Sequence, residues 1–170
     1  DHFEVDQVIE DSAVIVNCNN KNVEVGEHEM VTFSWANPTP WNTPREKTDE
    51  ELEPMLEELI AKVKDKSSAI FNFHAPPYGF ALDLAPKLDE NLVQAADNKI
   101  HVGSVAVANM IKKYQPLLGL HGHIHESRGV QKIQKTTIIN PGSEYSEGIL
   151  KGAIVVLEKN KVKDYVFTSG

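Results

Sequence analysis

Residues 117–125 read Leu-Leu-Gly-Leu-His-Gly-His-Ile-His, and the rest of this sequence can be interpreted outward from them. The apolar start of the segment is typical of a buried strand, and three of the seven histidines of the chain follow within five residues. Side chains alternate along a strand, so we expect His123 and His125 to point the same way, with Gly122 bending the chain after His121. Imidazole is a common ligand of transition metals. A His-x-His pair at the end of a strand therefore predicts a metal site.

A further histidine, His74, stands in a similar place. It follows the apolar run of residues 69–73 and precedes two prolines. A predicted amphipathic helix over residues 104–114 separates the two strands and would supply the crossover that a parallel pair needs. Ligands of α/β sheets collect outside the carboxyl ends of the strands. If the two strands are parallel neighbours, His74, His123 and His125 converge at one edge; the alternative is that they are polar residues of surface turns.

The rest of the chain predicts a layered α/β (α+β) domain with mixed sheets, a single domain over residues 1–170. A Thr-x-x-Glu capping box at residues 48–51 begins a helix whose apolar spacing extends to Val63, and Pro54 either starts its regular part or kinks it. Residues 36–45 hold three prolines and form a loop, whereas residues 78–100 form a long excursion of little periodicity. Strands are expected at residues 13–17, 22–25, 30–35, 136–139, 153–157 and 162–167, the last two as a hairpin.

Composition and charge exclude several classes of protein. The chain has 25 acidic and 17 basic residues, and its net charge of −8 argues against broad affinity for nucleic acid or anionic membranes. A phosphate substrate remains compatible, because a metal ion supplies its own positive charge. No apolar run approaches the roughly 20 residues that span a bilayer. The one cysteine excludes an internal disulfide, and we expect a cytoplasmic protein.

Other polar residues are weaker candidates. His101 precedes Gly103 and Ser104 at a helix start, where an anion could bind, and it is a tentative substrate-binding residue beside the plainer reading as a surface histidine. His2 and His28 lack supporting context and are expected at the surface. The loop over residues 41–45 is either a rigid turn or a wall of the site. Residues 140–143, Asn-Pro-Gly-Ser, predict a tight turn after a strand.

At these residues the chain resembles the calcineurin-like metallophosphoesterase superfamily. Residues 72–77, Asn-Phe-His-Ala-Pro-Pro, are similar to its isolated-histidine motif, and residues 122–125, Gly-His-Ile-His, match its Gly-His-x-His motif. Residues 140–143 are similar to the turn of its bacterial and archaeal phosphodiesterase branch. The resemblance runs from Ser68 to the end of the chain and implies a two-sheet β-sandwich flanked by helices.

The resemblance also implies a site and a reaction. His74 and His123 would bind one divalent metal and His125 the other, the metals being Mn, Fe, Zn or Ni, for hydrolysis of a phosphoester, which could be nucleotide-like, by a metal-activated water. The Asp-x-His, Gly-Asp and Gly-Asn-[His/Asn]-[Asp/Glu] motifs of the family are not found, although Asp1 could end the last of these. We therefore expect the C-terminal portion of a phosphoesterase, incomplete at its N-terminus and inactive or nearly so alone.

Two other functions stay open from the sequence. The chain could be a metallophosphoesterase-like scaffold that binds proteins and no longer catalyses, and it could form a homo-oligomer. It could instead be an unrelated single-metal enzyme that uses His-x-His plus His on a largely β scaffold, which the helix-crossover pattern disfavours. The sequence identifies neither the catalytic acid nor the physiological substrate.

Overall fold

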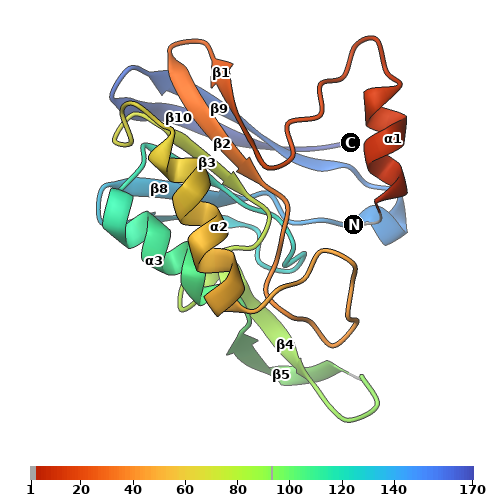
Figure 1. Cartoon of the computed structure of the whole chain (residues 1–170). Helices are drawn as coiled ribbons and strands as arrows, with labels where there is room; N and C mark the ends of the chain where they lie inside the picture. Colours follow the sequence, from red (N-terminus) through yellow and green to blue (C-terminus); the bar gives the residue numbers. More distant parts are fainter. Residues whose placement is uncertain (1–2, 93) are drawn as a thin grey trace.

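The computed structural model describes residues 3–92 and 94–170, and Figure 1 shows the whole chain. Asp1, expected as the end of a motif, and His2, expected at the surface, lie outside the described residues. Three α-helices, two 3-10 turns and ten strands are described over these ranges. They are α1 (Glu4–Glu10), β1 (Lys21–Val25), β2 (His28–Phe33), α2 (Asp49–Ala61), β3 (Ile70–Phe73), η1 (Ala81–Asp83), β4 (Leu84–Leu88), β5 (Gln94–His101), α3 (Val105–Tyr114), β6 (Leu118–Leu120), β7 (Gly129–Ile133), β8 (Thr136–Asn140), η2 (Tyr145–Glu147), β9 (Lys151–Glu158) and β10 (Lys161–Ser169).

The main sheet has six strands in the order β1-β2-β3-β6-β8-β7. The inner strands β2, β3, β6 and β8 run parallel, and β1 and β7 close the two edges antiparallel. The predicted parallel pairing of the strands before His74 and before the histidine segment is confirmed, with Ile70 opposite Leu118 and Asn72 opposite Leu120. The carboxyl ends of four parallel strands therefore meet at one edge, which is where both histidine segments begin.

Helices α2 and α3 cover one face of the sheet and lie side by side in front of it in Figure 1. The aromatic rings of Phe33, Phe71 and Phe73 all point toward this face. They form its core with Leu56 of α2 and Ile111 of α3. The predicted capping box is present at Thr48 and Glu51. The helix begins at Asp49 and includes Pro54, so its regular part starts before the proline.

The opposite face of the sheet carries the hairpin β9–β10, which forms a separate two-stranded sheet. Ile70, Leu118 and Ile139 of the main sheet pack there against apolar side chains of the hairpin, including Val155 and Phe167. The expected C-terminal hairpin and its place in a second layer are confirmed. The chain is a mixed α/β fold with two packed sheets flanked by helices, which is the fold class that the sequence predicted.

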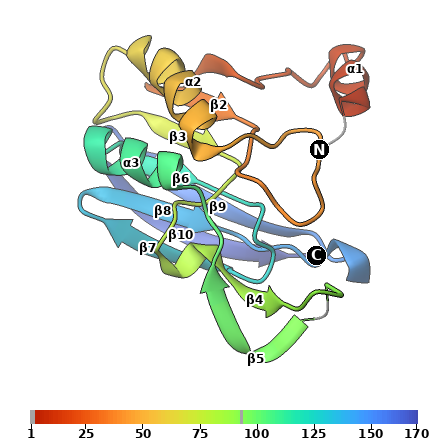
Figure 2. The ribbon, with the colours of Figure 1, turned by 60° about the horizontal axis from the view of Figure 1, so that its bottom comes forward.

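Two predictions from the sequence are wrong. Residues 13–17 form no strand, and Val14, Ile15 and Val16 stand exposed without a partner strand to pair with among the described residues. Residues 78–100 are not structureless, because η1, β4 and β5 build an antiparallel hairpin that projects below the sheet in Figure 2. Its register shifts between Pro86 and Leu88. The proline and the irregular register hide the strand alternation that sequence reading depends on.

Two further details also differ from expectation. His28 is 7% exposed rather than at the surface, and its Nδ1 lies 2.8 Å from the carbonyl oxygen of Ser68. The short edge strand β7 was not predicted. Among the described helices, none is both long and apolar enough to cross a membrane.

Candidate metal centre

His74 follows the last residue of β3, where the backbone still pairs with the neighbouring strands. Its N–H donates to the carbonyl oxygen of Phe33, 2.9 Å away, and its own carbonyl oxygen accepts from the N–H of Gly122 at 3.0 Å. The second of these bonds ties the loop after β3 directly to the loop after β6. Parallel strands with their loops joined in this way bring two histidine segments together at the carboxyl edge of the sheet.

The rings of His74 and His123 meet at this edge. Nε2 of His74 lies 3.2 Å from Nδ1 of His123, and the ring centroids are 4.9 Å apart in an edge-on arrangement. Burial lowers the pKa of each ring to about 4. Both imidazoles are therefore neutral near pH 7, the protonation state in which histidine binds a metal ion.

His123 reaches this position through an unusual backbone conformation. β6 ends at Leu120, so the histidine segment is a loop and the alternation of a strand does not apply to it. The bend that we expected at Gly122 falls on His123, whose φ is 63°. A side chain other than glycine in this left-handed region carries strain, and such residues gather at functional sites.

His125 differs from the pair in its exposure, although its charge adds to burial in lowering the pKa of both rings. Its side chain is exposed, and its ring meets that of Tyr145 edge-on with centroids 5.4 Å apart. Within residues 3–92 and 94–170, no group of three or more His, Cys, Asp or Glu side chains is arranged to hold a metal ion. The structure thus brings together His74 and His123, whereas the joint metal site of His74, His123 and His125 stays a prediction.

His121 has a supporting role that sequence reading missed. It is 5% exposed, and its Nδ1 lies 3.0 Å from the carbonyl oxygen of Phe73 and 3.1 Å from that of Ala75. A carbonyl oxygen only accepts, so Nδ1 carries the proton and donates to both. The ring therefore holds the backbone on either side of His74. The signal was present, since His121 opens the histidine segment, but nothing in the sequence shows which carbonyls it meets.

The Asn-Pro-Gly-Ser turn supports the other histidine segment. Asn140 is fully buried, and its Nδ2 donates to the carbonyl oxygen of Ile124 at 2.9 Å. Its Oδ1 accepts from the N–H of Gly142, and the N–H of Ser143 donates to the carbonyl oxygen of His125. The Asn140 side chain closes the turn of this motif, and the same contacts fix the loop that carries His123 and His125.

Glu46 is the carboxylate that acts most clearly on this edge, and its charge raises the proton affinity of His123. Partial burial by itself raises the pKa of Glu46, but hydrogen bonds from Thr39 and Thr43 outweigh burial, so the pKa is lowered. The backbone N–H and hydroxyl of each threonine donate to its oxygens at 2.5 to 2.9 Å. Its oxygens are engaged in holding the proline-rich loop, so Glu46 is a poor candidate for a bridging metal ligand.

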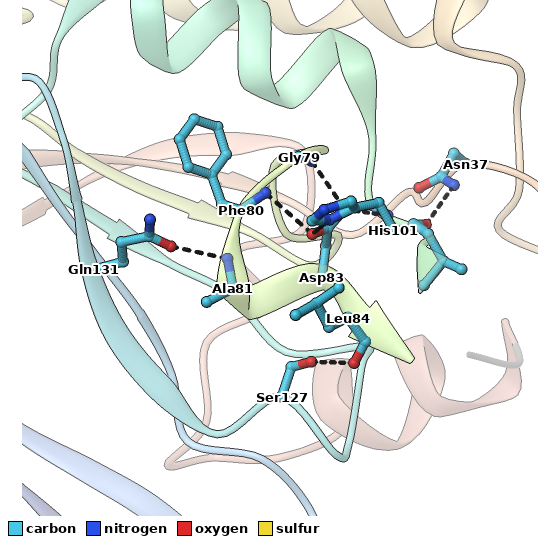
Figure 3. Close-up of polar contacts among 11 residues, drawn as sticks. Asn37, Gly79, Phe80, Ala81, Asp83, Leu84, His101, Ser127 and Gln131 are labelled. Carbon is cyan, nitrogen blue, oxygen red and sulfur yellow. Dashed lines mark hydrogen bonds and ion pairs between the residues drawn. The ribbon is translucent and has the colours of Figure 1, made fainter. Parts of the chain in front are cut away.

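His101, the tentative substrate-binding residue, belongs to a separate polar cluster at the base of the β4–β5 hairpin (Figure 3). Its Nδ1 lies 2.6 Å from Oδ1 of Asp83, a carboxylate with no exposed surface. The N–H groups of Gly79, Phe80 and Gly103 also donate to Asp83. Because a carboxylate only accepts, the proton sits on Nδ1, and Nε2 remains as the ring nitrogen that can meet a ligand.

The hairpin is joined to the histidine edge by hydrogen bonds on two sides. The hydroxyl of Ser127, two residues after His125, donates to the carbonyl oxygen of Leu84, which is opposite His101 in the β4–β5 ladder. Asn37, in the loop after β2, donates to the carbonyl oxygen of Val102 at 3.0 Å. Figure 3 shows both contacts flanking the Asp83 cluster. His101 therefore stands on a hairpin anchored to the loop that carries His123 and His125 and to the loop after β2.

One known protein is similar to this chain in sequence. No family model matches the chain. The uncharacterized protein MJ1162 of Methanocaldococcus jannaschii is 33% identical over 128 residues, which are 74% of this chain and 53% of that protein. The chain therefore spans about half the length of the curated relative that it matches.

Several solved structures resemble this chain to different degrees. One crystal structure is 19% identical with a TM-score of 0.56, over 91% of this chain and 50% of that one. The protein TT1561 of Thermus thermophilus is 19% identical with a TM-score of 0.46, over 79% and 52% of the two chains. The sulfate thiohydrolase SoxB of Thermus thermophilus, in complex with glycerol, is 12% identical with a TM-score of 0.41, over 88% and 24%. The first of these supports a shared fold, and the layered arrangement agrees with the fold that the metallophosphoesterase resemblance implied.

Proposed function

We propose that this chain forms part of a metal-dependent phosphoesterase and carries the histidine half of its site. The observation that supports this most directly is the meeting of His74 and His123, 3.2 Å apart, at the ends of two neighbouring parallel strands. Both residues belong to the motifs that resemble the metallophosphoesterases. A pair of neutral, half-buried imidazoles with a strained backbone and dedicated supports is costly to keep as a purely structural feature.

The residues present fit a divalent metal only in part. His74 and His123 would hold one ion, and imidazole nitrogen suits Mn, Fe, Zn and Ni according to their availability. His125 is the proposed ligand of a second ion. When bound, two such ions activate a water for attack on phosphorus and stabilise the attacking and leaving oxygens. No carboxylate of the described residues is placed to bridge two ions, so we propose that this chain alone is inactive or nearly so.

The proposed substrate is a phosphoester of a nucleotide-like kind, with His101 as a contact. His101 presents Nε2 from a hairpin that hydrogen bonds anchor to the metal edge. Tyr78 lies against it, with ring centroids 5.7 Å apart, and offers a half-exposed aromatic face to a planar leaving group. Broad binding of nucleic acid is not proposed, because the net charge is −8.

The test is metal binding by the chain itself. Manganese titration followed by electron paramagnetic resonance should show one weak site, lost in His74→Ala and in His123→Ala. His28→Gln is the matched control, since it removes another buried imidazole away from the carboxyl edge. Retention of manganese in both alanine variants would refute the proposed site. Hydrolysis of bis(p-nitrophenyl) phosphate should stay near background with excess manganese, and turnover abolished by His123→Ala would contradict the proposed inactivity.

A second candidate is a non-catalytic scaffold that binds proteins, with a second copy of this chain as the partner to test. One observation favours it: Ile154, Val156 and Val166 lie exposed on the hairpin β9–β10, with Ile154 opposite Val166. Exposed apolar clusters mark interaction surfaces. Analytical ultracentrifugation separates the two candidates, because the scaffold predicts self-association that Ile154→Lys abolishes and that manganese leaves unchanged.

A further inference from the structure

A pocket of about 370 Å³ adjoins the metal edge. It is bounded by the ends of β2 and β3, by the loop after β6 and by the short helix α1. Its polar lining includes Ser34, Arg45, Asn72 and His74. A candidate metal ligand therefore shares one pocket with a buried guanidinium, whose charge also lowers the pKa of His74.

Arg45 is buried in this wall without all of its donors being used. The residue is 7% exposed, and its two terminal nitrogens donate to Ser34 Oγ at 3.0 Å and to Asp6 Oδ2 at 2.6 Å. Nε is buried and has no hydrogen-bond partner among the described residues. An unpaired buried donor is costly, more so on a charged group. The guanidinium therefore retains capacity for a further acceptor at this place.

A second unpaired atom lies in the same pocket. Oγ1 of Thr32, another lining residue, is buried and also lacks a partner within the described part of the chain. Thr32 is opposite Asn72 in the β2–β3 ladder, so the two side chains share a face of the sheet. A hydroxyl, an amide and a guanidinium around one cavity are groups that hydrogen-bond the oxygens of an anion.

The Asp6 carboxylate, which is hydrogen-bonded to Arg45, belongs to a segment that is little buried. Asp6 belongs to α1, a helix of 7 residues that buries none of them, and its side chain is 30% exposed. Phe3, just before the helix, adds a contact with the body: it lies against Trp35 and under Arg45, 5.0 Å from Cζ to the ring centroid. An added oxyanion can therefore compete with the Asp6 carboxylate for the buried guanidinium of Arg45.

We propose that Arg45 is an anion-binding residue of this pocket, which takes the phosphoryl oxygens of a phosphoester beside His74, and that the Asp6 carboxylate competes with them. Bidentate binding of a phosphoryl group would use Nε together with the terminal nitrogen that Asp6 now occupies. The identification of the anion as a phosphoester rests on the proposed function. The binding of an oxyanion by Arg45 does not, since it requires no metal.

The experiment measures inorganic phosphate binding to the whole chain by calorimetry at low salt with EDTA present, so that metal binding plays no part. Asp6→Asn should lower the Kd for phosphate about twofold to fivefold, the usual size for release of one competing ion pair. Arg45→Gln should remove the binding. The double variant Asp6→Asn with Arg45→Gln leaves no unpaired charge and should bind no better than Arg45→Gln, which separates loss of the site from loss of folding.

Glu158→Gln is the matched control, because it frees Lys161 and Lys163 on the distant hairpin and changes net charge by the same amount. An equal gain of affinity in this variant would show a general charge effect and overturn the proposal. So would phosphate binding that survives in the folded double variant, or an unchanged Kd in Asp6→Asn. Failure of manganese binding with these phosphate results intact would refute the metal site alone.

Discussion

A Cβ atom added to Gly119 would lie 2.8 Å from Nε2 of His121. The glycine therefore makes room for the buried ring that holds the backbone on both sides of His74. Ile138, on the neighbouring strand, closes the same space at 3.0 Å, so the ring cannot move away within the sheet. We therefore expect a substitution at Gly119 to alter the metal edge through the displaced ring of His121.

We predict that Gly119→Ala destabilises the fold by about 1–3 kcal/mol, the usual cost of overpacking a core. It should also weaken manganese binding, because a displaced His121 releases the carbonyl oxygens of Phe73 and Ala75. Urea unfolding and manganese titration measure the two effects. Gly26→Ala is the contrast: it strains a turn with φ of 60° but has no atom within 4 Å of its added Cβ, so it should cost stability and leave manganese binding intact. Equal manganese affinity in Gly119→Ala and the unaltered chain would contradict the role given to His121.

The burial of His121 also predicts a pH dependence of stability without metal. Burial lowers the pKa of His121 to about 4, against 6.5 in an unfolded chain. Between these values the unfolded state binds more protons, so stability rises with pH there and is lost as the pH falls from about 6.5 to about 4. The loss from this ring approaches about 3 kcal/mol, at 1.36 kcal/mol per pKa unit.

The measurement is urea unfolding in EDTA at several pH values between 4 and 8. His121→Gln can still donate to the two carbonyl oxygens but does not titrate, so its stability should fall less steeply with acid. Burial of His74 and His123 adds to the slope in both proteins and cancels in the comparison. Identical slopes in the two proteins would show that His121 does not titrate as its burial implies.

The sequence predicted the parallel strands, the crossover helix α3 and the C-terminal hairpin because each has a clear apolar period or a clean turn. It failed at residues 13–17, where an apolar run predicts a strand only if another strand is present to pair with it. The meeting of His74 and His123 was predicted because strand ends are visible in the sequence, whereas their role as metal ligands stays a prediction. The roles of Arg45, Asp83 and His121 depend on contacts between residues 18 to 48 positions apart, which no local pattern records.

The contact between α2 and α3 gives a further prediction. Oδ1 of Asp49, at the start of α2, accepts from the hydroxyl of Ser104 and from the N–H of Ala106, 3.0 Å away, at the start of α3. Asp49→Ala removes an acceptor through which the start of α2 holds the first turn of α3, and should cost about 1–2 kcal/mol. Thermal unfolding measures it, with Glu50→Ala as the control one residue further along the exposed first turn. A loss no larger than that of Glu50→Ala would show that Asp49 is only a solvated residue favoured by the helix dipole.

Asp83 should decide whether His101 serves a ligand or only the fold. The carboxylate is fully buried and accepts from His101 and from three backbone N–H groups, two of them on Oδ2. Asp83→Asn replaces an acceptor with a donor and leaves buried N–H groups unpaired, so we expect a loss of about 2–4 kcal/mol. His101→Gln keeps a donor for Asp83 on a side chain that is 40% exposed, and should cost less than about 1 kcal/mol. Hydrogen exchange of the β4–β5 amides and urea unfolding separate the two variants.

If His101 contacts a phosphoester, an added nucleoside monophosphate should protect those amides from exchange, and His101→Gln should weaken this protection. The same variant should leave the protection without ligand unchanged. If His101 is only a partner for Asp83, the two variants should differ in stability alone, and neither should alter the response to the nucleotide.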